Sequence, residues 1–177
     1  MMKPALLSVV GRKGCGKSKV IEILIADFKM RGYRIGLIKH LAKAGAEIDQ
    51  PGKDTYRYRK CGAETVVLSG QIQMALFSDV AQEMPLEKIL LFFEGCDLVL
   101  LEGYYLESVV KVEVHRTGMG NFLTQGMDNV LAVVSDSVTS SLAMHFAHEQ
   151  IAGLASRVEA WIKSGAGTLI PTTEIHA

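Results

Sequence analysis

Apolar and polar residues follow two different rhythms along this chain. Residues 5–10 form an almost unbroken apolar run, which is typical of a buried strand. Within residues 20–28 the apolar positions recur every four residues, which predicts a helix with one apolar face. Residues 34–40 are typical of a second strand. Two strands joined through one helix by short connections imply a right-handed parallel crossover.

The rest of the chain predicts more strands and helices. Residues 65–69 and 72–77 are two short β-type runs around Gly70, which we interpret as a hairpin. Residues 110–116 alternate between apolar and polar, as in a strand with one solvent-exposed face. The other predicted elements are a loop over 41–53, helices over 54–61, 85–93 and 140–163 (the last in two pieces around Gly153), buried strands over 97–101 and 129–134, and a loose tail over 165–177.

Strands that alternate with helices predict an α/β fold of three layers. The central sheet is expected to be mostly parallel, with ligands at the carboxyl ends of its strands, and the hairpin is an added antiparallel region. At 177 residues, the chain is expected to form one domain spanning residues 1–177.

Composition narrows the function classes. Hydrophobic residues make up 49% of the chain and charged residues 21%, as in a globular protein. The formal net charge is zero and no apolar stretch approaches a membrane span, so we expect neither nucleic-acid nor membrane partners. The first residues lead directly into a strand, unlike a signal peptide. Cys15, Cys61 and Cys96 lie far apart, which favours a reducing cytoplasm over a zinc or disulfide framework.

The segment between the first strand and the first helix carries a phosphate-binding motif. Its residues fit the pattern G-x-x-x-x-G-K-[ST], in which glycines let backbone N–H groups converge on phosphate oxygens. The positive end of the helix dipole adds to this attraction. Lys17 would reach the β- and γ-phosphates, and the Ser18 hydroxyl would bind Mg²⁺. The predicted phosphate-binding residues are Gly11, Arg12, Lys13, Gly14, Cys15, Gly16, Lys17 and Ser18. The fold is therefore expected to be that of a P-loop NTPase.

A second candidate feature is a carboxylate at the end of a buried strand. Glu102 follows the apolar run 97–101, and Gly103 lets the chain turn away. A hard cation prefers oxygen ligands, so Glu102 is a candidate for Mg²⁺ or its water shell. The alternative is a solvated glutamate that ends a strand.

A third group lies at the end of the second strand and in the loop beyond it. Lys39, Lys53, Asp49 and Asp54 are candidates for the γ-phosphate and its metal, and either carboxylate could orient an attacking water. His40 is a candidate general base or phosphate donor. The alternatives are a helix cap for Asp54, a solvated charge for Lys53 and a structural role for His40.

The end of the last buried strand offers a base-recognition group. A carboxylate at Asp136 can accept hydrogen bonds from guanine N1–H and N2–H, which would favour GTP over ATP. The Asn-Lys-x-Asp guanine signature is absent, and a turn-forming aspartate is the alternative. His145 and His148 lie three residues apart on a predicted helix, where we expect surface positions rather than metal ligands.

Several segments together resemble one family, MobB, the molybdopterin-guanine dinucleotide biosynthesis protein B. The resemblance covers roughly residues 5–136, and its more specific parts are Ile38-Lys39-His40 and Pro51-Gly52-Lys53-Asp54. The other segments that carry it are the phosphate loop, 61–63, 97–103 and 111–116.

The resemblance implies a protein that binds GTP with Mg²⁺ and forms homodimers. It implies assistance to a MobA-like guanylyltransferase that couples GMP to molybdopterin, with strand 110–116 in a sheet region used for dimerisation. Lys17, Asp54 and His40 are the candidate catalytic residues. No arginine finger is evident, so we expect slow GTP hydrolysis, with extra positive charge from Arg12, Lys13 or a dimer mate.

Two other functions remain open at this point. One is an ATP-dependent small-molecule kinase or ligase, similar in fold to dethiobiotin synthetase, in which Lys39, His40 and Lys53 grip an anionic substrate. The other is a nucleotide-switched adaptor that catalyses no useful reaction.

Overall fold

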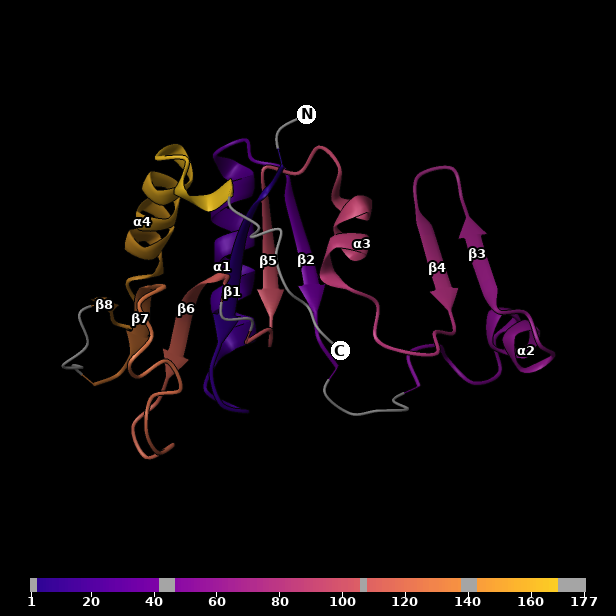
Figure 1. The fold of residues 1–177 in the computed structure, drawn as a ribbon, viewed down its shortest axis with the longest axis horizontal. Helices are drawn as coiled ribbons and strands as arrows, with labels where there is room; N and C mark the ends of the chain where they lie inside the picture. The colour runs from indigo at the N-terminus through magenta and orange to yellow at the C-terminus, as the bar shows by residue number, and fades with distance from the viewer. Residues whose placement is uncertain (1–2, 42–46, 106–107, 138–142, 169–177) are drawn as a thin grey trace. The chain divides into compact units, whose positions relative to one another are not determined.

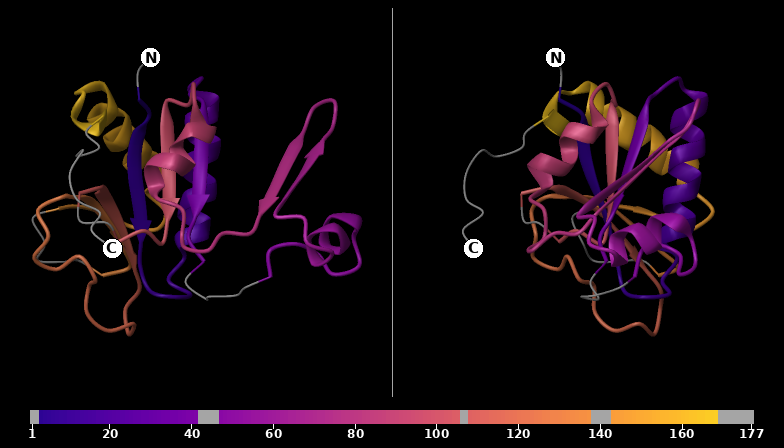
Figure 2. Two further views of the ribbon diagram at one scale, coloured as in Figure 1. Left: turned by 45° about the vertical axis from the view of Figure 1, so that its right-hand side comes forward. Right: turned by 90° about the vertical axis from the view of Figure 1, so that its right-hand side faces the viewer.

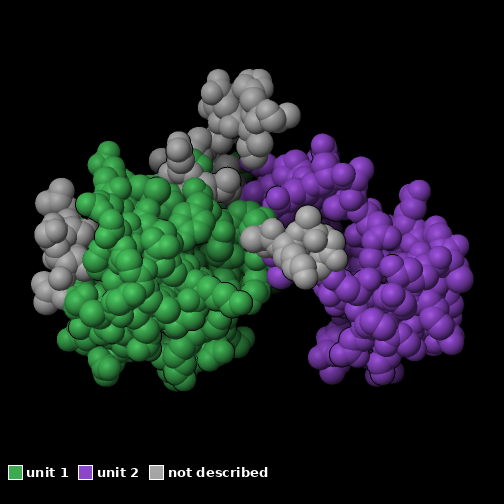
Figure 3. All heavy atoms as spheres, turned by 90° about the horizontal axis from the view of Figure 1, so that it is seen from below, with its two compact units in different colours: residues 1–40, 93–177 green, residues 41–92 purple. Residues whose placement is uncertain are grey.

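The computed structural model describes residues 3–41, 47–105, 108–137 and 143–168. It divides the chain into two compact units, which Figure 3 shows in different colours. The first contains residues 1–40 and 93–177, and the second contains residues 41–92. The expectation of one domain over residues 1–177 stays a prediction.

A parallel sheet of six strands forms the centre of the first unit (Figure 1). Each neighbouring pair in it is parallel, so all six carboxyl ends point to the same edge. In spatial order the strands are β2 (Ile35–Lys39), β5 (Leu98–Glu102), β1 (Ala5–Val10), β6 (Val110–His115), β7 (Val130–Ser135) and β8 (Met144–Phe146). This arrangement confirms the expected α/β class and the mostly parallel central sheet.

Two helices cover one face of this sheet, α1 (Lys17–Met30) and α4 (Ile151–Lys163). Their apolar faces join alternate residues of the strands in a single core that includes Leu7, Leu24 and Leu154. Burial of this apolar surface is the main stabilising contribution, at about 25 cal/mol per Å².

Polar contacts join the same two helices at the surface. Glu159 on α4 accepts hydrogen bonds from Arg31 Nη1 at 2.6 Å and Tyr33 Oη at 3.1 Å, and it pairs with Lys163 Nζ at 2.7 Å. The Lys163 and Arg31 contacts lower the pKa of Glu159 to about 2. Glu159 therefore stays ionised at neutral pH and holds the end of α1 against α4.

The strand expected to have one solvent-exposed face is buried on both faces. Lys111, Glu113 and His115 of β6 are all buried. The loop of residues 120–124 covers the face on which Glu113 and His115 lie. The Glu113 carboxylate accepts hydrogen bonds from the backbone N–H of Leu123 at 2.7 Å and from the Thr124 N–H and hydroxyl at 2.9 and 2.6 Å. Lys111 Nζ donates to the Val109 carbonyl at 2.8 Å.

The sequence pattern of this strand was therefore misread. Its polar residues face a cover of loop backbone, which supplies their hydrogen-bond partners, and not solvent. Strand β6 is paired on both sides, with β1 and with β7, and a role of this sheet region in dimerisation stays a prediction.

The helix expected over 140–163 is shorter at its start. The described part contains β8 over 144–146 and begins helix α4 at Ile151, so Gly153 lies in the first turn and does not divide the helix. Residues 138–142 lie outside the described part. Pairing of β8 with β7 overrides the local helical pattern, and His145 and His148 consequently share no helix.

The described residues of the second unit form two α-helices and the expected hairpin. The strands β3 (Thr65–Ser69) and β4 (Met74–Ser78) pair antiparallel, and Gly70 N–H donates to the Gln73 carbonyl in the turn at 2.8 Å. This confirms the hairpin, with its second strand starting two residues later than expected. The helices are α2 (Asp54–Lys60) and α3 (Leu86–Leu90), and a short 3-10 turn, η1 (Leu91–Phe93), follows α3.

The helix expected over 85–93 and the loose tail expected over 165–177 differ from the structure in their bounds. Pro85 precedes α3 as its N-cap residue, and the helix is shorter than the predicted 85–93. A 3-10 turn, η2 (Ala166–Thr168), follows α4, and the rest of the predicted tail, 169–177, lies outside the described residues. Among the described helices, none has the length and apolar character needed to cross a bilayer.

The hydrogen bonds of the buried Glu113 carboxylate should stabilise the fold. Glu113→Ala should lower the free energy of unfolding by about 3 kcal/mol, because it leaves three buried donors without their acceptor. Glu113→Gln should cost less, since one acceptor oxygen remains. Urea unfolding followed by circular dichroism measures both. Glu22→Ala, at an exposed position of α1, is the control, and equal stability of Glu113→Ala and this control would contradict the prediction.

Candidate functional site

The phosphate motif forms the connection between β1 and α1, which Figure 2 shows from two further directions. The helix begins at Lys17, and its N-cap residue, Gly16, has a φ of 105°. No acidic residue lies in the first turn of α1, and no side chain caps it. The first N–H groups of the helix are therefore available to an anion.

Two close neighbours leave no room for a side chain at the first glycine of the motif. Gly11 has a φ of 150°, and a Cβ at this position would lie 2.2 Å from the Val114 carbonyl oxygen and 2.7 Å from Cys15 Sγ. Any side chain would therefore displace the loop from β6. The Gly11 N–H donates to the Tyr105 hydroxyl at 3.2 Å, and burial raises the pKa of Tyr105.

The motif lysine bridges the loop. Lys17 Nζ donates to the carbonyls of Gly11 at 2.8 Å and Arg12 at 2.9 Å. Its ammonium is thus held across the loop, and a phosphate-binding role for Lys17 stays a prediction. Arg12 instead reaches toward the carbonyl of Asn121, at 3.5 Å, and Lys13 is exposed. Cys15 is fully buried, so it offers only its backbone to a ligand.

The structure brings three predicted residues together beside the loop. Ser18 Oγ donates to Glu102 Oε1 at 3.4 Å, and Lys39 Nζ lies 3.3 Å from Glu102 Oε2. The register explains this, because Glu102 is level with Val9 of β1 and with Lys39 of β2. A hydroxyl and a carboxylate are hard oxygen donors of the kind that Mg²⁺ prefers. The donor chemistry of Ser18 and Glu102 therefore fits magnesium.

His40 lies at the same edge of the sheet. Its backbone N–H donates to the Glu102 carbonyl at 3.0 Å, and its ring centroid lies 5.3 Å from that of Tyr104. Gly103, with a φ of 84°, turns the chain next to it. A catalytic role for His40 stays a prediction.

A second cluster lies at the ends of β6 and β7. The Asp136 carboxylate accepts hydrogen bonds from the Thr117 N–H at 2.8 Å and the Thr117 hydroxyl at 2.9 Å, which lower the pKa of Asp136. Arg116 Nε donates to the Cys15 carbonyl of the phosphate loop at 3.2 Å. Arg116 was not among the site residues predicted from the sequence, although its place at the end of a predicted strand was a usable signal.

Three predicted residues, Asp49, Lys53 and Asp54, belong to the other compact unit. Asp49 is buried, and its Oδ1 accepts hydrogen bonds from Gln50 N–H at 2.8 Å and Thr55 Oγ1 at 3.0 Å. Lys53 is the N-cap residue of α2, and the exposed Asp54 is its first residue. Asp54 pairs with Arg57 at 2.8 Å and does not cap the helix. Their roles at a nucleotide stay predictions.

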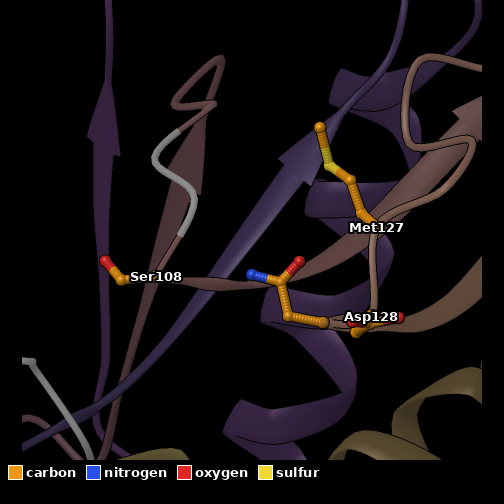
Figure 4. A pocket seen from close by; sticks show the side chains of 4 residues that line it. Ser108, Met127 and Asp128 are labelled. Atoms are coloured by element: carbon orange, nitrogen blue, oxygen red, sulfur yellow. The ribbon is translucent and has the colours of Figure 1, made fainter.

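A separate hollow of about 440 Å³ lies away from this edge (Figure 4). It is lined by Ser108, Met127, Asp128 and Asn129, which precede β6 and β7. It therefore lies at the amino ends of β6 and β7, at the edge of the sheet opposite the phosphate loop, which follows β1. Within the described residues, no three His, Cys, Asp or Glu side chains form a metal-binding group of protein ligands alone.

Comparison with known proteins identifies the family. The chain is 31% identical over 168 residues to the molybdopterin-guanine dinucleotide biosynthesis adapter protein of Escherichia coli, covering 92% of this chain and 95% of that protein. The adapter protein of the same description from Haemophilus influenzae is 31% identical over 133 residues, 74% of each chain.

Solved structures show the same fold. A MobB homologue from Bacillus stearothermophilus superposes with a TM-score of 0.69 at 21% identity, covering 90% of this chain and 98% of that one. Bacillus subtilis MobB gives 0.69 at 21% identity, covering 86% and 97%. The family model described as molybdopterin guanine dinucleotide synthesis protein B matches residues 6–136. With this match and the two 31% identical relatives, the chain belongs to the MobB family.

Proposed function

We propose that this protein is a Mg²⁺-dependent GTP-binding adapter of molybdopterin guanine dinucleotide biosynthesis that hydrolyses GTP slowly. The pathway and the adapter role follow the names of its relatives in E. coli and H. influenzae. Nucleotide binding is supported most strongly by Lys17, whose ammonium is held across a loop at the open N-terminus of a helix. In this role it would assist a MobA-like guanylyltransferase that acts on molybdopterin.

Each side of the proposed phosphate site has its own task. The backbone N–H groups of 11–18 bind phosphate oxygens, and Lys17 neutralises the β- and γ-phosphates. Ser18 and Glu102 would hold Mg²⁺, which would supply charge neutralisation, and Lys39, beside Glu102, would add positive charge near the phosphates. Because Ser18 and Glu102 already lie side by side, metal binding requires little rearrangement of the chain.

The remaining predicted residues complete the proposal. His40 and Asp54 are candidates for orienting the attacking water, and Asp49 and Lys53 for the metal and the γ-phosphate. Asp54 is exposed, whereas Asp49 is buried and bonded to Thr55, so Asp54 is the more accessible carboxylate. Arg12 reaches toward the Asn121 carbonyl, so this described arginine of the loop is not directed to the γ-phosphate, and we expect hydrolysis to be slow.

We also propose that the protein forms a homodimer through its hairpin. Apolar side chains are exposed on both faces of β3 and β4, which is unusual for a surface that stays in water. They include Val67, Leu68, Met74 and Leu76, and Ile72 is exposed in the turn between the strands. An antiparallel hairpin has two free edges in this unit, and pairing with a second copy would cover both the edges and these side chains.

Lys17→Ala tests the phosphate site. We expect GTP affinity in the presence of Mg²⁺ to fall at least about tenfold, since one cation at the β- and γ-phosphates is lost. Isothermal titration calorimetry measures the affinity, and phosphate release measures turnover. Lys29→Ala, in the last turn of the same helix, is the matched control. Hydrolysis by the wild-type protein alone at tens per second would contradict the proposed slow GTPase.

Asp136→Asn tests the choice of base. The variant should bind GTP at least about tenfold more weakly and gain affinity for xanthosine triphosphate, because an amide can donate where the carboxylate accepts. Thr117 can still donate to the amide oxygen, so the local fold is kept. If the wild-type protein prefers ATP to GTP in the same titration, the guanine proposal is wrong and an ATP-dependent kinase or ligase is favoured.

Leu76→Lys tests the dimer. Placing a charge at the paired position Val67–Leu76 of the hairpin should convert the dimer to a monomer, measured by light scattering coupled to size-exclusion chromatography. Met30→Lys, at another exposed apolar residue in the first unit, should leave the mass unchanged. A monomeric wild-type protein at tens of micromolar would refute the homodimer.

A further inference from the structure

A cluster of polar side chains surrounds the last glycine of the phosphate loop on one side. A Cβ at Gly16 would lie 3.8 Å from an Arg116 Nη nitrogen and 3.7 Å from His148 Cε1. His148 Nε2 lies 3.3 Å from the His115 carbonyl oxygen, which fixes its ring near the end of β6. Thr117, next to Arg116, holds the carboxylate of Asp136. The ends of β6 and β7 and the turn after β8 thus meet at Gly16.

This cluster lies on the opposite side of the loop from the proposed metal site. Glu102 ends β5 and Arg116 follows β6, and these two strands flank β1 on its two sides. If Mg²⁺ and the terminal phosphates lie beside Glu102, the other half of the nucleotide has to extend toward Arg116. The strand order therefore suggests that the phosphates lie toward β5 and the nucleoside toward β6.

The guanidinium of Arg116 is suited to a flat ligand. Its Nε donates a hydrogen bond to the Cys15 carbonyl, which fixes the plane of the guanidinium beside the loop. Among the described residues, no carboxylate forms an ion pair with Arg116, and its side chain is exposed. An aspartate at the end of β7 can read only the edge of a base, so the face of the ring needs a separate contact. A planar cation can stack on an aromatic ring.

We propose that Arg116 is the residue that binds the nucleoside half of the nucleotide, by stacking its guanidinium on the face of the base. The inference rests on the proposed nucleotide binding and adds to it a residue and an orientation. Asp136 reads the edge of the same base, and His148 lies beside Gly16. Because Arg116 also donates a hydrogen bond to the Cys15 carbonyl, its contact with the base depends on the conformation of the phosphate loop.

A comparison of ligands with and without a nucleoside tests this role. Arg116→Ala should weaken GTP and GDP binding about tenfold and leave inorganic tripolyphosphate within about twofold of wild type, each with Mg²⁺ in calorimetry. Arg116→Lys keeps the charge without the planar group, so it should also bind GTP more weakly than wild type. Arg157→Ala, at an exposed position of α4, should change none of these affinities.

The outcomes separate this inference from the proposal on which it rests. Equal losses for GTP and tripolyphosphate would mean that Arg116 only holds the loop, and unchanged GTP affinity would mean that it does not contact the ligand; either result overturns the inference alone. A wild-type protein that binds no GTP overturns the proposed function itself. If Arg116→Ala unfolds, as thermal denaturation would show, Arg116→Lys and Arg116→Gln carry the same comparison.

Discussion

The parallel pairing of β5 and β6 on the two sides of β1 is the constraint on which the candidate site depends. It places the ends of all three strands at one edge of the sheet, where the chain of β1 turns through a glycine loop into α1. Glu102 and Arg116 then reach the loop from opposite sides, although they lie 84 and 101 residues from their partners Ser18 and Cys15. A different strand order would separate these groups.

Burial of β6 links the stability of the sheet to the shape of the loop. Glu113 holds the backbone of Leu123 and Thr124, and the segment before them lies against the phosphate loop, where Met119 Cε is 3.6 Å from a Cβ placed at Gly14. A buried carboxylate that accepts three hydrogen bonds is stable, whereas a buried carboxylate without donors strongly destabilises the fold. The same hydrogen bonds therefore support the core and the back of the candidate site.

The unit formed by residues 41–92 is held together by other kinds of contact than the parallel sheet. Its helix α2 is anchored by Asp49 and Thr55 and by surface ion pairs, and its hairpin leaves apolar side chains such as Leu76 exposed. An isolated two-stranded hairpin is only marginally stable in water, and its exposed apolar side chains are the observation behind the proposed contact with a second copy.

The sequence by itself determined the features that local chemistry controls. The glycine pattern of 11–18 required a strand, a loop and a helix, the run 97–101 required a buried strand that ends in Glu102, and Gly70 between two β-type runs required a hairpin. Those patterns, with the family's short motifs, were enough for the fold class and the family.

Only the tertiary structure decided what depends on distant partners. The alternation of 110–116 fits a half-exposed strand as well as a buried one, and only the loop over Glu113 decides between them. Residues 144–146 have a helical pattern but form a strand, because β7 offers them an edge. Arg116 gains its place at the loop from the strand order alone, since no local pattern records which strands are neighbours.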